Sequence, residues 1–142
     1  MRLAIGATIV GILCFNTNLS AQPDKQLYEL QQRCGRFAKE VFDREYSPPV
    51  LDTEHGQTVF NYENHYNARL NKCFFLEIAV SCEKEKSTSS KIMRLFDLSQ
   101  NNEYGTFVSG PTESTPLACV VRGNTCRSES EWRQLLKSFM ED

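Results

Sequence analysis

The chain has 142 residues, a formal net charge of −2, 24% charged residues and 40% hydrophobic residues. This length suits one domain, and the composition is too apolar for an intrinsically disordered chain. A chain with this small negative charge lacks the basic surface typical of nucleic-acid-binding proteins, so we expect no nucleic acid partner.

The N-terminal residues have the pattern of an export signal. Arg2 precedes an apolar run that ends at Asn16, and Ala21 is a small residue suited to cleavage. The run is shorter than the roughly 20 apolar residues of a membrane-spanning helix, so we expect no transmembrane segment in the mature chain. We therefore predict a signal peptide over residues 1–21, export to the periplasm or the extracellular space, and a single domain over residues 22–142.

A first helix is predicted to begin closely after Pro23 and to end before Ser47. Apolar residues recur there at steps of three or four, which gives one inward-facing stripe. Asp24 can cap the start of the helix, and the two prolines that follow Ser47 end it. The stripe consists of Leu27, Leu30, Cys34, Phe37, Ala38, Val41 and Phe42. Residues 47–56 are predicted to form a loop.

From Gln57 onward, apolar residues recur at every second position, which is typical of strands. About five strands are predicted, and the strongest runs from Cys73 to Cys82. The others begin near Gln57, Lys91, Tyr104 and Leu117. Connections shorter than about a dozen residues exclude parallel crossovers, so we expect an antiparallel meander.

A second helix is predicted after Ser128, because Ser128 and Glu131 have the spacing of a capping box. Its apolar face consists of Trp132, Leu135, Leu136, Phe139 and Met140. The order of one helix, about five strands and one helix predicts an α+β fold. We expect both the N-terminal and the C-terminal helix to pack on one face of the sheet.

The mature chain has five cysteines and no Cys-x-x-Cys pair, which favours structural disulfides over a zinc or thiol-redox site. Cys73 and Cys82 are about 30 Å apart along one strand, which is too far for a bridge. We predict the disulfides Cys34–Cys73 and Cys119–Cys126, with Cys82 a buried free thiol. The rival pairing is Cys82–Cys119 with Cys126 free.

The predicted Cys34–Cys73 bridge conflicts with a regular strand. Cys73 has the parity opposite to Phe74 and Leu76, which lie on the apolar face of the strand. We therefore expect the strand to start after Cys73 or to bulge there.

Motifs for catalysis or metal binding are weak in this sequence. His55 lies in the carboxylate-rich stretch 52–56, which is more typical of a solvated turn than of a metal site. The sequence has no phosphate-binding loop, Gly-x-Ser-x-Gly motif or His-Glu-x-x-His motif. We expect no cofactor and no metal. The alternative to a non-enzymatic role is a hydrolase that uses acidic residues, because any Asp/Glu pair can meet in the folded chain.

The segment from Asn61 to Phe74 alternates Asn and Tyr with basic side chains. Its Asn-Tyr-x-Asn-His-Tyr-Asn and Leu-Asn-Lys-Cys-Phe motifs, together with residues 126–132, resemble small exported bacterial proteins of uncharacterised function. The resemblance implies an exported α+β domain and no particular activity.

We expect a non-catalytic domain that binds a protein or a cell-envelope component. Interfaces favour Tyr and Arg, which combine a large contact area with a polar group. The candidate recognition residues are Tyr62, His65, Tyr66 and Arg69. By parity, Tyr62 and Tyr66 lie on the side of Phe60, where they are also suited to a core position. His65 and Arg69 have the opposite parity.

Overall fold

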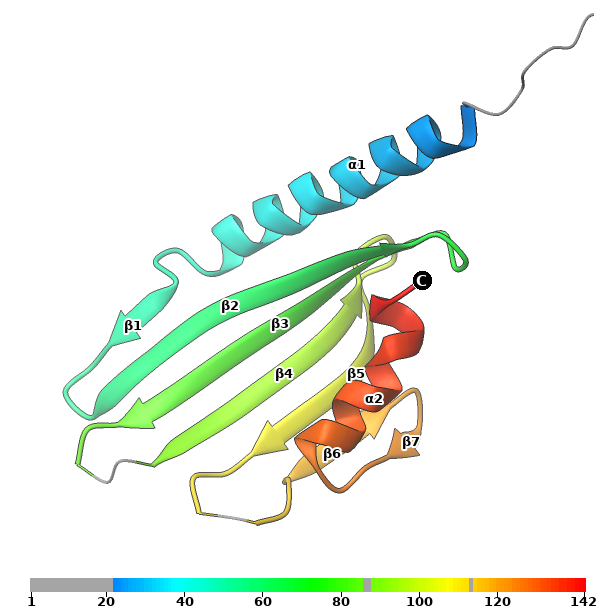
Figure 1. The fold of residues 1–142 in the computed structure, drawn as a ribbon. Helices are drawn as coiled ribbons and strands as arrows, with labels where there is room; N and C mark the ends of the chain where they lie inside the picture. Colours follow the sequence, from blue (N-terminus) through cyan, green and yellow to red (C-terminus); the bar gives the residue numbers. More distant parts are fainter. Residues whose placement is uncertain (1–21, 86–87, 113) are drawn as a thin grey trace, which may run out of the picture.

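In the computed structural model, one antiparallel sheet is flanked by two helices (Figure 1). The structure describes residues 22–85, 88–112 and 114–142, so the predicted signal peptide lies outside the described residues. The helices are α1 (Gln22–Glu45) and α2 (Glu129–Met140). The strands pair in sequence order and are β1 (Val50–Asp52), β2 (Gly56–Asn67), β3 (Lys72–Glu83), β4 (Ser89–Asp97), β5 (Asn102–Ser109), β6 (Ala118–Val121) and β7 (Asn124–Thr125).

The predicted α+β class and the antiparallel meander are confirmed, but the sheet is larger than expected. It has seven strands within the described residues instead of about five. β1 lies in the stretch 47–56 that was predicted as a loop, and β7 follows Gly123. Both strands are too short for apolar alternation to appear in the sequence. Helix α1 begins at Gln22, ahead of the predicted cap at Asp24.

Residues with positive φ form the tight turns of the meander. Arg122 (φ 48°) and Gly123 (φ 83°) make the two-residue turn between β6 and β7, as a type I′ hairpin requires. Asn71 (φ 51°) and Asn101 (φ 53°) each stand last in the turns between β2 and β3 and between β4 and β5. Asparagine enters the left-handed region more readily than most residues, which explains its place in these turns.

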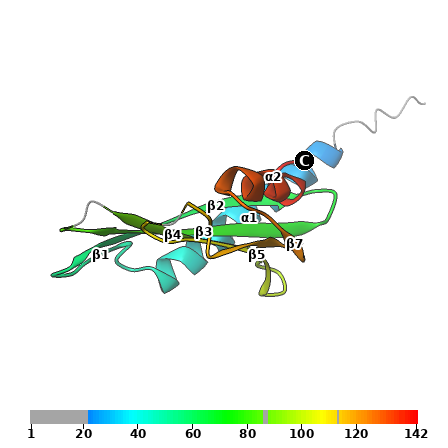
Figure 2. The same ribbon diagram turned by 90° about the horizontal axis from the view of Figure 1, so that it is seen from below.

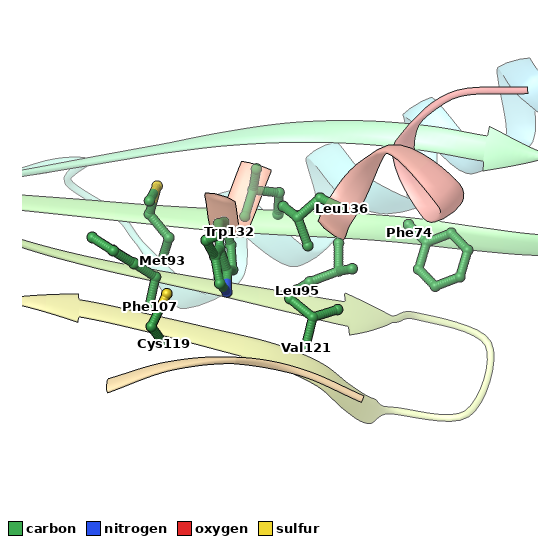
Figure 3. Close-up of a cluster of buried hydrophobic side chains, with 9 residues drawn as sticks. Phe74, Met93, Leu95, Phe107, Cys119, Val121, Trp132 and Leu136 are labelled. Atoms are coloured by element: carbon green, nitrogen blue, oxygen red, sulfur yellow. The ribbon is translucent and has the colours of Figure 1, made fainter. Parts of the chain in front are cut away.

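Helix α2 covers the main hydrophobic core (Figure 3). Trp132 is fully buried, and its indole Nε1 donates to the carbonyl oxygen of Val120 at 3.2 Å. The core cluster consists of Phe74, Leu76, Met93, Leu95, Phe107, Cys119, Val121, Trp132 and Leu136. Ser128 is the N-cap, as predicted, because its Oγ accepts a hydrogen bond from the backbone N–H of Glu131 at 3.2 Å. The Glu131 carboxylate accepts from the backbone N–H of Arg127 at 2.8 Å, one residue before the N–H that completes a capping box.

Helix α1 packs on the opposite face of the sheet. A disulfide joins its Cys34 to Cys73, and Tyr62, which contacts the helix, stacks on Phe75 with ring centroids 5.3 Å apart. Cys73 and Phe75 alternate along β3 with Phe74 of the α2 core, and alternate residues of a strand point to opposite faces. Figure 2 shows the sheet nearly edge-on, with α2 on one side and the cyan C-terminal half of α1 on the other.

The two helices therefore do not share one face, in contrast to the sequence-based expectation. This arrangement removes the conflict at Cys73, which lies inside β3 and pairs with Tyr66 without a bulge between β2 and β3. Short connections exclude parallel strands, but they do not decide which face of the sheet a flanking helix covers.

Both predicted disulfides are present, with Cα–Cα distances of 5.4 Å for Cys34–Cys73 and 5.0 Å for Cys119–Cys126. Cys82 is free, as predicted, but it is exposed instead of buried. It has the parity of Phe74, yet it lies near the end of β3, outside the cluster that α2 covers. Cys82 is exposed because α2 is short and covers only part of that face of the sheet.

Candidate functional site

A groove runs along α1 on the face of the sheet that this helix covers. It consists of two neighbouring cavities of about 460 Å³ and about 450 Å³, and Phe37 lines both. The helix side of the groove includes Leu30, Arg33, Cys34, Phe37, Val41 and Arg44. The sheet side includes Tyr66, Cys73, Phe75, Glu77, Arg94 and Phe96. We call this feature the α1 groove, with the larger cavity as its first cavity and the other as its second.

The first cavity has an apolar floor. The Cys34–Cys73 disulfide forms part of it, and Tyr66 lies beside the disulfide with only 9% of its surface exposed. The Tyr66 hydroxyl donates to Asn71 Oδ1 at 2.6 Å, so its polar end is satisfied. The charged side chains that line this cavity are Arg33, Arg36 and Glu40.

Phe37 stands between the two cavities and is 41% exposed. It belongs to the predicted inward stripe of α1, but the buried residues of that stripe are its neighbours Cys34 and Ala38. Other aromatic residues under α1 are in ring contact, such as Phe42 with Tyr62 at 4.7 Å. Within the described part of the chain, Phe37 has no such contact, so its ring is available to a ligand.

An ion pair between a buried carboxylate and a half-exposed guanidinium lies in the second cavity. Glu77 is 5% exposed, and Arg94 Nη2 donates to both of its carboxylate oxygens, at 2.8 Å and 2.9 Å. The hydrogen bond to Glu77 raises the pKa of Arg94 above its usual value, although partial burial opposes the shift. Arg94 Nε is buried and has no hydrogen-bond partner among the described residues.

Tyr46 adds a hydroxyl group to the second cavity. Its burial, and secondarily its hydrogen bond to Glu77, raise the pKa of Tyr46 to about 12. The phenol therefore stays protonated at neutral pH and acts as a hydrogen-bond donor. The ring stacks on Phe60 at 4.7 Å, which holds the side chain against β2.

Arginine engages both carboxylates that line the second cavity. Arg94 holds Glu77, and Arg44 Nε lies 2.8 Å from Glu45 Oε1. A general base needs a carboxylate that is free to accept a proton from the substrate. The second cavity is therefore better suited to binding than to proton transfer.

The structure separates the four predicted recognition residues into two pairs. Tyr62 and Tyr66 lie under α1, where Tyr62 is held between aromatic rings and Tyr66 lines the first cavity. His65 and Arg69 lie at the C-terminal end of α2: His65 Nε2 is 3.3 Å from Asp142 Oδ1, and Arg69 Nη2 donates to a backbone carbonyl at 2.9 Å. Of the four, Tyr66 lines the α1 groove.

The groove residues Phe37, Glu77 and Arg94 were missed as site candidates. Glu77 carried a signal, because it is a charged residue in the middle of the most apolar strand. A carboxylate at such a position requires a partner, and Arg94 is its direct neighbour across β3 and β4. Phe37 carried no signal, because its spacing is that of a core residue.

Comparison of the chain with protein-family models, with curated proteins and with solved structures found no match. Neither α1 nor α2, the helices of the described residues, has a stretch long and apolar enough to cross a membrane. Over the same residues, no group of three or more His, Cys, Asp or Glu side chains is placed to hold a metal ion.

Proposed function

We propose that this protein is an exported, non-catalytic binding domain that holds an apolar part of a partner protein or cell-envelope component in the α1 groove. The observation that carries the proposal is the exposed Phe37 ring between two open cavities, the first of which has a largely apolar lining. Each cavity is within the range of about 300–1,000 Å³ that is typical of ligand sites. Two disulfides in a small domain support an oxidising, exported location.

The charged groups of the groove favour binding over the hydrolase alternative. Arg94 and Arg44 neutralise Glu77 and Glu45, and Tyr46 keeps its proton at neutral pH. These groups give the groove fixed polar contacts beside its apolar residues, a combination that is typical of small-ligand sites. Tyr66 retains a role in this proposal as part of the floor of the first cavity.

A retention experiment tests the proposal. The purified protein is immobilised and exposed to cell-envelope extract, and the retained proteins and lipids are identified by mass spectrometry. Phe37→Asp places a charge between the two cavities, so we expect it to lose a component that the wild type retains. Tyr28→Asp is the matched control, because Tyr28 is 58% exposed on the same helix and does not line the groove.

Equal melting temperatures show that both variants are folded. The proposal is contradicted if Phe37→Asp retains the same components as Tyr28→Asp and the wild type. A second control removes the other pair of predicted recognition residues: His65→Ala with Arg69→Ala leaves the groove intact. We expect that double variant to retain the component.

A further inference from the structure

Two arginines that line the first cavity have no partner among the described residues. Arg33 and Arg36 are exposed on α1, and among the described residues neither forms a hydrogen bond, an ion pair or a ring contact. Other arginines near the groove are engaged, as Arg44 is with Glu45 and Arg94 with Glu77. The three-residue spacing of Arg33 and Arg36 places both on one side of the helix.

The surroundings of these two arginines combine positive charge with an apolar floor. Leu30, Phe37 and the Cys34–Cys73 disulfide line the same cavity. Glu40 is the carboxylate that lines it within the described chain, so two guanidinium groups face one acidic group. A guanidinium group matches the geometry of a carboxylate and is weakly hydrated, which suits a site at the border of an apolar cavity.

We propose that the first cavity binds a single-chain carboxylate amphiphile, with the apolar chain on the floor beside Phe37 and the carboxylate between Arg33 and Arg36. The inference rests on the proposed function of the groove and names the ligand class for it. The cavity volume of about 460 Å³ lies toward the lower end of the range for ligand sites, which favours one chain over the several chains of a membrane lipid. The second cavity, which Phe37 also lines, adds the aromatic rings of Phe75 and Phe96 beside its charged groups.

Replacing Glu40 tests the charge argument with an expected effect opposite to that of replacing the arginines. Its carboxylate lines the same cavity as Arg33 and Arg36 and repels an anionic head group. Glu40→Gln keeps the size of the side chain and removes this repulsion. The proposal therefore requires that Glu40→Gln tightens binding, whereas neutralising the two arginines weakens it.

The experiment compares decanoate with the uncharged decanol, both below the concentration at which they aggregate. Binding is measured by titration while backbone amide NMR signals report the location. For the wild type, we expect shifts around Phe37 and Cys73 and a preference for decanoate of about three- to tenfold, the size expected for solvent-exposed ion pairs. Raising the salt concentration should reduce the preference, because the charges are exposed.

Variants distinguish the contribution of the arginine charges to binding from the contribution of the apolar floor. Arg33→Gln with Arg36→Gln should abolish the preference for decanoate without changing the affinity for decanol. The matched control neutralises two other charges on α1 that do not line the cavity, by Lys25→Gln with Lys39→Gln, and should retain the preference.

Each of the other outcomes overturns a specific part of the proposal. Equal binding of decanoate and decanol to the wild type overturns the carboxylate assignment and leaves the apolar groove function standing. A preference that persists in the double arginine variant overturns the role of Arg33 and Arg36. If neither compound binds, or if the shifts lie outside the groove, this inference fails, whereas the proposed function is decided separately by the retention experiment with Phe37→Asp.

Discussion

At the residue scale, Asn67 holds the C-terminal end of α2 with its side-chain amide. The residue is fully buried, and its Nδ2 lies 3.2 Å from the carbonyl oxygens of Ser138 and Phe139 and 3.1 Å from that of Glu141. Its Oδ1 accepts the backbone N–H of Leu70 at 2.9 Å. One side chain thus makes hydrogen bonds both to the last carbonyl groups of α2 and to the turn between β2 and β3. These bonds explain why a polar residue of the segment 61–74 is fully buried.

Asn67→Asp should destabilise the protein strongly at neutral pH. The substitution keeps the shape, removes the donor and places a negative charge against the negative end of the α2 dipole. We expect a loss of about 2–4 kcal/mol in the free energy of unfolding, which denaturant titration measures. Asn61→Asp is the control: Asn61 is exposed and uses its Oδ1 as an acceptor from Tyr62 N, a role that aspartate retains. Equal losses for the two variants would contradict this role of Asn67.

The Glu77–Arg94 pair gives a second prediction at this scale. Glu77→Leu leaves the Arg94 charge without its anion, and because Arg94 is 41% exposed, we expect a moderate loss of about 1–3 kcal/mol. Glu77→Leu with Arg94→Met replaces the pair by apolar side chains and should recover most of that loss. Chemical denaturation of the three proteins checks the order, and a double variant less stable than the single variant would argue against it.

At the scale of elements, each disulfide fixes a different kind of contact. Cys34–Cys73 joins α1 to the sheet across a sequence separation of 39 residues, whereas Cys119–Cys126 closes a loop with a separation of 7 residues near β7. The chain-entropy argument assigns a larger stabilisation to the longer loop, about 4 kcal/mol against about 2.5 kcal/mol.

Replacing each cysteine pair by serine tests this order. We expect the Cys34→Ser/Cys73→Ser protein to have the lower free energy of unfolding, and to lose ligand binding in the α1 groove because the helix is no longer held at β3. The Cys119→Ser/Cys126→Ser protein should keep the groove. The opposite order of stability, or a groove that survives the first replacement unchanged, would show that packing alone holds α1.

The start of α2 is joined to β4 by an ion pair that depends on pH. Lys91 Nζ lies 2.7 Å from Glu129 Oε2, and Arg133 Nε lies 3.1 Å from Glu129 Oε1. Burial opposes ionisation, but the hydrogen bonds from Lys91 and Arg133 outweigh it and lower the pKa of Glu129 below 4.5. A lowered pKa in the folded state means that the stabilisation is present above the usual carboxyl pKa and is lost as the pH falls through the lowered value.

Glu129→Gln should therefore lower the melting temperature at pH 7, and the difference from the wild type should shrink as the pH falls below 4.5. Thermal melts followed by circular dichroism between pH 7 and pH 3 measure this difference. Glu141→Gln is the control, because its carboxylate lies 4.0 Å from Lys137 and is exposed, so its effect should be small throughout. A difference for Glu129→Gln that does not depend on pH would contradict the role of the ion pair.

These elements show which parts of the fold and of the candidate site are predictable from the sequence. The steps of α1, the alternation along β3 and the Ser128 capping box predicted their elements because each signal is local. The face covered by α1 is a property of the whole sheet, and the parity of Cys73 was its only trace in the sequence. The candidate site was predicted less well: Phe37 has the spacing of a core residue, and its exposure follows from where α1 crosses the sheet.

At the scale of the whole molecule, the two helices have different roles. Helix α2 closes the main core on one face, with Trp132 fully buried at its centre. On the other face, α1 packs mainly over β2 and leaves the α1 groove open beside it, floored by β3 and β4. The main hydrophobic core thus lies on the α2 face, whereas the α1 face holds the open groove.

Site-specific photo-crosslinking tests the α1 groove most directly. Benzoylphenylalanine replaces Phe37 in the groove or, as a control, Leu117, which is 64% exposed and does not line the groove. Both proteins are produced in cells that export them and are irradiated there. We predict a discrete crosslinked product from position 37 and none of the same mass from position 117. The same products from both positions, or a product from position 117 alone, would contradict a binding site in the α1 groove.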